Sequence, residues 1–143
     1  MRQRAFTTGI MLSVLFFFSV SGHSQDEPSP LTKAIYLTKS GDYELALQYC
    51  NESIQSKPQN PNAYYIRGFA RYNLGRYQQA IKDFDTTISL NNNHADAYFY
   101  RGTCKKELKK YWSAFRDYRK AKQIAPNMTN MNLIQNFFST LFS

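Results

Sequence analysis

Residues 61–94 read PNAYYIRGFARYNLGRYQQAIKDFDTTISLNNNH, and residues 95–128 continue as ADAYFYRGTCKKELKKYWSAFRDYRKAKQIAPNM. These two stretches align over their full 34 residues without an insertion or a deletion, and residues 27–60 align with both. A fixed period of this length indicates units that are each one supersecondary element, which buries its apolar face only against its neighbours. The matching positions carry turn-forming, aromatic and small residues: Gly41, Gly75 and Lys109; Tyr43, Tyr77 and Tyr111; Ala46, Ala80 and Ala114; Cys50, Phe84 and Tyr118.

The small residues predict two helices that cross closely within each unit. Gly68 and Gly102 fall on the expected first helices and Ala80 on an expected second helix, and aromatic rings fill the space around the crossing. Gly75 is expected to end its helix in the left-handed conformation, whereas Lys109 at the equivalent position predicts strain or a different turn. The expected helices span residues 29–39, 43–56, 62–74, 78–90, 96–108 and 112–124.

This pattern resembles the tetratricopeptide repeat (TPR), a helix–turn–helix unit of 34 residues. The second unit carries the resemblance best, and the first is weaker, with Pro30 at the aromatic position and Ala34 in place of glycine. Arg67 and Arg101 depart from the family pattern, because they occupy its usual leucine position. The resemblance implies an all-α superhelix, a solenoid with repeats at 27–60, 61–94 and 95–128. The matching residues of the second unit are Tyr64, Gly68, Leu74, Gly75, Ala80 and Phe84.

Residues 129–143 follow the third repeat and read TNMNLIQNFFSTLFS. On a helix their apolar residues form one broad stripe, and a repeat array needs a cap for the apolar face of its last unit. The segment is therefore predicted to be a C-terminal capping helix. The alternative is a helix that docks onto a partner, a second copy or a membrane surface through Phe137, Phe138, Leu141 and Phe142.

The N-terminal residues 1–24 have the composition of a secretory signal peptide. Arg2 and Arg4 precede an 11-residue run, IMLSVLFFFSV at 10–20, and small residues follow before Gln25. The run is shorter than the roughly 20 residues that span a bilayer, so cleavage before Gln25 is expected, followed by a short linker at 25–28. Cleavage after Gly22 and an uncleaved membrane anchor are the alternatives. An export signal ahead of such repeats indicates a bacterial protein that is periplasmic or secreted.

The residue types leave little room for catalysis or cofactors. His94 is the one histidine outside the expected signal peptide, and no glycine-rich phosphate loop occurs, so neither a metal site nor an enzyme is predicted. Cys50 and Cys104 are separated by a whole repeat and are expected to be buried thiols without a disulfide. Residues 95–128 contain nine basic and three acidic residues, whereas 27–60 contain three and four. The basic end favours acidic partners or a solvated outer face, and export disfavours nucleic acid.

One charged pair recurs within the repeats. Arg67 and Asp83 are separated by 16 residues, as are Arg101 and Asp117. If the helices of one hairpin pack as expected, each arginine reaches its aspartate and forms a charge-assisted hydrogen bond. As partly solvated pairs they are expected to contribute about 1 kcal/mol or less, and a ligand-binding role for the arginines is the alternative.

The resemblance to TPR proteins also implies where a partner binds, because such arrays use their first helices to line a concave groove. Family members that clamp a chain-terminal carboxylate use Lys, Asn and Arg at several groove positions. Here four of those positions hold Leu31, Ile35, Ile66 and Tyr100, so no carboxylate clamp is expected. By position, the groove comprises Ile35, Lys39, Asn62, Tyr65, Phe69, Tyr72, Phe99, Thr103 and Lys106, with Asp96 and Tyr100 beside them.

The sequence therefore predicts a non-catalytic protein–protein interaction module without cofactors, which binds a peptide or a partner helix in this groove. The alternative is a structural subunit of a cell-envelope complex that joins its partners through its ends and the C-terminal helix. Some of the aromatic groove residues could equally belong to the core. The identity of the partner is not encoded in any motif of the chain.

Overall fold

The computed structural model describes residues 27–128 and Ser139. Between Pro30 and Ile124 the chain is helical apart from short turns, and each observed helix begins and ends within one residue of its expected range. The predicted signal peptide and, apart from Ser139, the predicted capping or docking helix lie outside the described residues. The helices are α1 (Pro30–Ser40), α2 (Tyr43–Ser56), α3 (Pro61–Asn73), α4 (Tyr77–Leu90), α5 (Ala95–Glu107) and α6 (Tyr111–Ile124).

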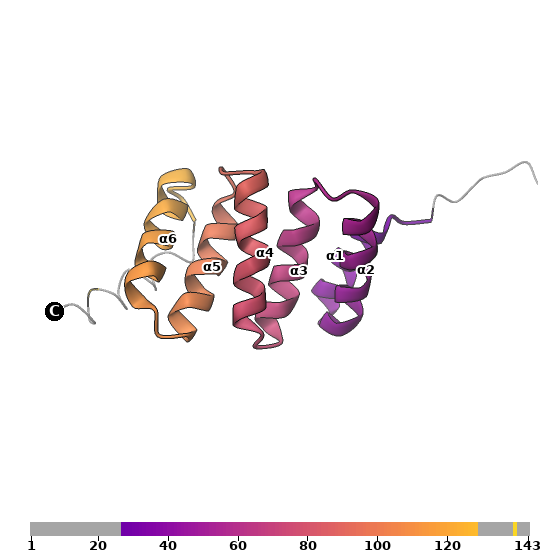
Figure 1. Ribbon diagram of the computed structural model, residues 1–143, viewed down its shortest axis with the longest axis horizontal. Helices are drawn as coiled ribbons and strands as arrows, with labels where there is room; N and C mark the ends of the chain where they lie inside the picture. The colour runs from indigo at the N-terminus through magenta and orange to yellow at the C-terminus, as the bar shows by residue number, and fades with distance from the viewer. Residues whose placement is uncertain (1–26, 129–138, 140–143) are drawn as a thin grey trace, which may run out of the picture.

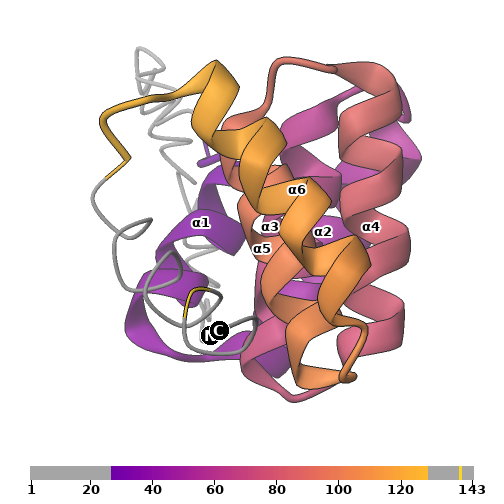
Figure 2. The same ribbon diagram turned by 90° about the vertical axis from the view of Figure 1, so that its left-hand side faces the viewer.

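Successive helices form three hairpins that stack along one axis (Figure 1). Viewed along that axis, the first helices α1, α3 and α5 form one layer and the second helices α2, α4 and α6 form another (Figure 2). The second helices α2 and α4 each pack on the first helix of the next hairpin, and α1 also contacts α3, as α3 contacts α5. The protein is therefore an all-α solenoid, and we call the surface formed by α1, α3 and α5 the inner face.

All three hairpins use the same turn between their helices. Gly41, Gly75 and Lys109 adopt positive φ angles of 89°, 72° and 60°. The residue after each donates its backbone N–H to the carbonyl five residues earlier, at 2.9, 2.8 and 2.8 Å, which is the longer hydrogen bond of a Schellman motif. Lys109 thus adopts a left-handed conformation that favours glycine. The expectation of a different turn is therefore wrong, and the expected strain at this position stays a prediction.

The close crossing of the two helices is confirmed at Gly68 and Gly102. A Cβ atom on Gly68 would lie 2.9 Å from Cε1 of Phe84, and one on Gly102 would lie 3.0 Å from Cε1 of Tyr118. Both distances are shorter than ordinary van der Waals contact. The missing side chains let the aromatic rings of the second helices rest directly on the backbone of the first helices.

Arg67 connects three helices through its guanidinium group. Its Nε and Nη2 donate to Oδ1 of Asp83 on α4 at 3.1 and 2.7 Å, and its Nη1 donates to the Asn51 side chain on α2 at 2.8 Å. Asp83 accepts a further bond from Nη1 of Arg71 at 2.7 Å. Arg67 therefore fixes both its own hairpin and the contact with the preceding one.

Arg101 repeats this arrangement one unit later. It donates to Asp117 at 2.9 and 2.6 Å and to Asp85 of the preceding repeat at 2.7 Å, while Lys105 donates to Asp117 at 2.7 Å. The predicted 16-residue pairing is confirmed. The carboxylates are less solvated than expected, because Asp117 is buried and meets both Arg101 and Lys105. The size of the contribution of each pair to stability stays a prediction.

Candidate binding surface

Three aromatic residues of α3 lie on the inner face at the spacing of successive helical turns. The ring centroids of Tyr65 and Phe69 are 6.4 Å apart, and those of Phe69 and Tyr72 are 6.3 Å apart. All three side chains are half-buried, so each ring has one part packed and another part at the surface. The sequence places them on one side of α3 because residues four and three apart share a helix face.

Tyr100 of α5 joins these rings into one cluster. Its ring centroid is 4.9 Å from that of Phe69 in an edge-on arrangement, 5.5 Å from Tyr72 and 6.3 Å from Tyr65. Phe84 of α4 lies beneath, 6.2 Å from Tyr100, and is fully buried. We call Tyr65, Phe69, Tyr72 and Tyr100 the ring cluster, and it spans the contact between repeats two and three.

Burial sets the protonation of the ring cluster. It raises the pKa of the Tyr65 hydroxyl above its usual range, and it raises the pKa of Tyr72 and Tyr100 as well, with nearby acidic groups adding to the shift. These hydroxyl groups therefore stay neutral at physiological pH. The cluster presents aromatic faces and neutral hydroxyls, which suit an apolar partner better than a charged one.

His94 extends the ring cluster at the start of α5. Its ring lies 4.6 Å from that of Tyr65, and its Nδ1 accepts the backbone N–H of Ala97 at 3.3 Å. Burial lowers the pKa of His94, although the neighbouring Asp96 opposes this shift. A neutral imidazole suits the site because a protonated ring has no acceptor left for the helix N-terminus.

The predicted groove residues divide into two groups. Ile35, Lys39, Asn62 and Lys106 are half-buried or exposed on the first helices, as are the three aromatic residues of α3. Phe99 and Thr103 are instead 8% and 9% exposed.

The correction at Phe99 and Thr103 has a clear physical cause. Phe99 packs with Ala114 and Tyr118 of α6, and the Tyr118 hydroxyl lies 3.2 Å from Oγ1 of Thr103. Both side chains thus belong to the interior of repeat three. The observation agrees with the alternative that some aromatic groove positions are core.

The four positions that the resemblance assigns to a carboxylate clamp carry uncharged side chains in this chain. Leu31, Ile35, Ile66 and Tyr100 are half-buried in the structure.

None of the helices between Pro30 and Ile124 has the length and apolar composition that crossing a membrane requires. In the same part of the chain, no group of His, Cys, Asp and Glu side chains is placed to hold a metal ion. Cys50 and Cys104 are buried free thiols, as expected.

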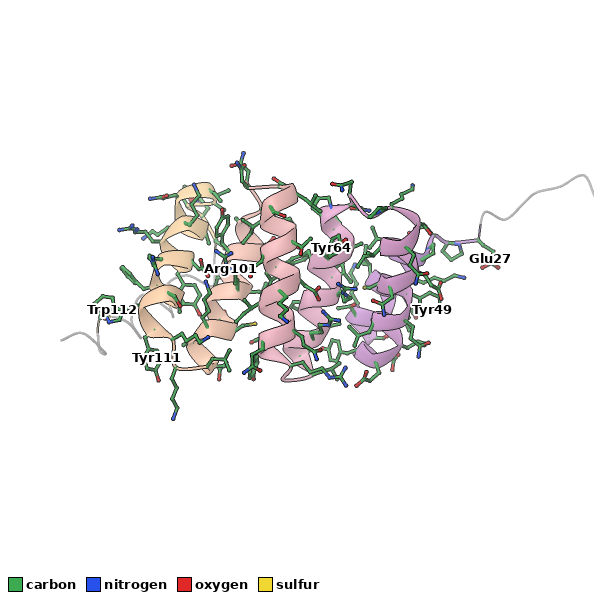
Figure 3. The ribbon with its side chains drawn as sticks, in the orientation of Figure 1. Glu27, Tyr49, Tyr64, Arg101, Tyr111 and Trp112 are labelled. Carbon is green, nitrogen blue, oxygen red and sulfur yellow. The ribbon has the colours of Figure 1, made fainter. Side chains whose placement is uncertain are left out.

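Sequence reasoning missed the acceptors Asn51 and Asp85 in the preceding repeats. The signal was present, since each lies 16 residues before its arginine, as each paired aspartate lies 16 residues after it. Figure 3 shows Arg101 within the array, with Glu27 and Trp112 at its opposite ends. The possible docking residues Phe137, Phe138, Leu141 and Phe142 lie outside the described part of the chain.

Stacked hairpins of this geometry, with an aromatic inner face, define a helical-repeat interaction scaffold. A family model described as tetratricopeptide repeat matches residues 32–102. Together with the 34-residue register and the solved structures below, this match shows that the chain belongs to the tetratricopeptide repeat family. No match to a curated protein sequence was found.

Several solved TPR domains have a similar structure. The Arabidopsis OM64 TPR domain is 23% identical, with a TM-score of 0.75, and the alignment covers 78% of this chain and 92% of that one. The first TPR of Spaghetti (RPAP3), bound to the HSP90 peptide SRMEEVD, is 25% identical with a TM-score of 0.74, covering 85% and 100%. The second TPR domain of human RPAP3, in complex with the HSP70 peptide SGPTIEEVD, is 24% identical with a TM-score of 0.69, covering 73% and 88%.

Proposed function

We propose that this protein is a non-catalytic binding module, which receives an apolar peptide or an amphipathic partner helix on the inner face. The observation that carries the proposal is the ring cluster of Tyr65, Phe69, Tyr72 and Tyr100, whose members are all half-buried. Buried core contacts are already supplied by Phe84 beneath the cluster. Aromatic side chains that keep exposed faces are the residue type that most often dominates binding energy.

The chemistry of the inner face distinguishes its partner from the acidic peptides bound by the RPAP3 domains. Those peptides end in EEVD, whereas the corresponding clamp positions here include Leu31, Ile66 and Tyr100. A carboxylate placed there would lose water without gaining a charged partner. Lys39 and Lys106 lie at the ends of α1 and α5 and can accompany an apolar segment that carries an acidic residue at one end.

The test is a peptide selection followed by matched variants. A phage-displayed peptide library is selected against the purified protein, and the affinity of the recovered peptides is measured by fluorescence anisotropy. We expect apolar sequences, and Tyr65→Ala is expected to weaken their binding by about 1–2 kcal/mol or more, the range for a central aromatic contact. Tyr64→Ala is the control, because Tyr64 is the adjacent tyrosine of α3 and packs on Arg67 at 5.4 Å, outside the ring cluster.

Two results contradict this assignment. One is recovery of peptides that end in acidic residues and bind through a carboxylate. The other is equal loss of affinity in both tyrosine variants when their melting temperatures also fall equally, because binding would then depend only on folding. The SRMEEVD peptide serves as a negative probe and is expected not to bind measurably.

We also propose that the module acts outside the bacterial cytoplasm, periplasmic or secreted, after removal of residues 1–24. The support is the basic start and the 11-residue apolar run at 10–20. Expression of the complete gene in a bacterium, followed by intact-mass measurement of the periplasmic fraction, is expected to give a product that begins at Gln25. A product of full-length mass in the membrane fraction contradicts cleavage.

A further inference from the structure

Repeat one differs from the other repeats at the positions of the ion-pair network. Repeat two pairs Arg71 with Asp83, and repeat three pairs Lys105 with Asp117. The equivalent residues of repeat one are Leu37 and Tyr49. Lys33, at the position of the bridging arginines, lies over the Tyr49 ring at 5.7 Å and pairs with Glu27 at 2.9 Å. The space that holds buried charges elsewhere is thus lined mainly by apolar atoms at this end of the array.

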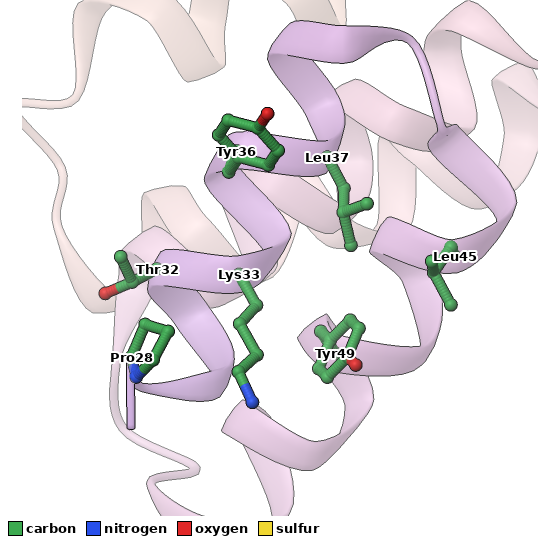
Figure 4. A pocket seen from close by; sticks show the side chains of 7 residues that line it. All are labelled: Pro28, Thr32, Lys33, Tyr36, Leu37, Leu45 and Tyr49. Carbon is green, nitrogen blue, oxygen red and sulfur yellow. The ribbon is translucent and has the colours of Figure 1, made fainter. Parts of the chain in front are cut away.

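An open pocket results between α1 and α2. It has a volume of about 370 Å³, and its walls include Pro28, Tyr36, Leu37, Leu45 and Tyr49. Figure 4 shows Leu37 and Tyr49 between the two helices, with Lys33 beside the Tyr49 ring and Tyr36 near the upper turn of α1. The Tyr36 side chain is 72% exposed and that of Leu45 is 43% exposed.

Tyr36 prevents this end from being extended by another hairpin of the same kind. The equivalent residues in repeats two and three are Ala70 and Cys104, which are both fully buried. Cys104 packs with Ala80 and Phe84 of the preceding hairpin, so position 36 points to where a preceding hairpin would lie. A tyrosine ring there keeps a helix from approaching to the distance seen inside the array.

The charge distribution indicates what can approach this end instead. Residues 27–60 carry a net charge of −1, whereas residues 95–128 carry +6. Two copies of such a basic chain repel each other least when they meet through repeat one, because their basic repeats then lie farthest apart. An exposed ring beside an open pocket on the same surface is also self-complementary, which a two-fold contact requires.

We propose that the repeat-one end is a self-association surface, on which two copies meet about a two-fold axis. The Tyr36 ring of each copy enters the pocket lined by Leu37, Leu45 and Tyr49 of the other. This arrangement leaves the ring cluster on the inner face of both copies accessible, so a dimer presents two binding surfaces to one partner or to two. The gain in apparent affinity for a partner with two binding segments would follow from effective concentration alone.

Sedimentation velocity of the purified product of the complete gene tests this proposal. The intact mass is measured first, so that any uncleaved N-terminal segment is known. We expect the wild-type protein to dimerise within a concentration series that extends to about 100 µM. Association of Tyr36→Ser is expected to be about 100-fold weaker, because each dimer contains two inserted rings. Leu45→Arg is expected to give a monomer as well, since it places two like charges near the axis. Trp112→Ser is the control, because it removes a ring that is 70% exposed at the opposite end.

The salt dependence separates this contact from head-to-tail association. Raising NaCl from about 50 to about 300 mM is expected to strengthen the two-fold dimer, because salt screens the repulsion between two basic chains. Head-to-tail contacts between the acidic and basic ends would weaken under the same change and would form open chains. A wild-type protein that is monomeric throughout, a dimer unaffected by Tyr36→Ser and Leu45→Arg, or association that weakens with salt each overturns the proposal.

Discussion

Replacing Asp83 by asparagine tests whether the buried ion-pair network stabilises the array. The Asp83 side chain is 3% exposed and accepts hydrogen bonds from Arg67 at 2.7 and 3.1 Å and from Arg71 at 2.7 Å. Asparagine has nearly the same shape, so the substitution leaves no cavity. It removes the negative charge and turns one acceptor into a donor that faces guanidinium groups.

The expected loss follows from the burial of the partners that remain. Removing one member of a buried ion pair destabilises a protein by about 3–5 kcal/mol, because the other charge is left uncompensated. Arg67 and Arg71 have side chains that are 18% and 23% exposed, so water relieves part of this penalty. We therefore expect Asp83→Asn to lower the free energy of unfolding by about 3 kcal/mol.

Urea unfolding followed by circular dichroism measures this loss directly. Glu44→Gln is the matched control, because it breaks the Arg76–Glu44 pair, which is as short at 2.6 Å but has side chains 43% and 63% exposed. An exposed pair of this kind contributes about 0.5 kcal/mol. If Asp83→Asn loses no more stability than Glu44→Gln, the buried ion-pair network does not stabilise the array.

Three further substitutions or treatments have defined outcomes. Lys109→Gly should stabilise the fold by about 1 kcal/mol in urea unfolding, because φ is 60° at this residue; an unchanged midpoint would show that the turn is not strained. Stability should be lost as pH falls from about 7.5 to about 5, because the pKa of His94 is lower in the folded than in the unfolded protein, where it is about 6.5. His94→Asn keeps an N-cap acceptor and should remove much of this loss of melting temperature, and an unaltered pH profile would contradict the assigned role. Burial raises the pKa of both Cys50 and Cys104 to about 12. A thiol reagent at about pH 8 should therefore label neither residue until guanidinium unfolds the chain. Rapid labelling of the native protein would contradict their burial.

The repeat register explains how much of the fold was predictable from the sequence. Turn residues such as Gly75, small residues such as Gly68 and buried residues such as Phe84 occupy positions that repeat every 34 residues, and each type has a local reason for its place. Helix boundaries follow from these markers. The Arg101–Asp117 pairing was equally accessible, because one separation occurs in two successive repeats.

The remaining features depend on neighbours that the register does not specify. Periodicity places Phe99 on a first helix, but it does not determine whether the side chain faces the groove or packs with Tyr118 inside repeat three. The second acceptor of Arg67, Asn51, lies on α2 and becomes available only when two repeats pack together. The proximity of His94 to Tyr65 likewise arises only when two repeats are packed together.

A chemical-shift titration tests the central claim most directly. ¹⁵N-labelled protein is titrated with an apolar peptide recovered from the library, and the amide shifts are mapped onto the six described helices. The account predicts the largest changes on the inner face, around Tyr65, Phe69 and Tyr72 of α3 and Tyr100 of α5. Largest changes on the outer layer formed by α2, α4 and α6, or no saturable change in the ring cluster, would contradict it.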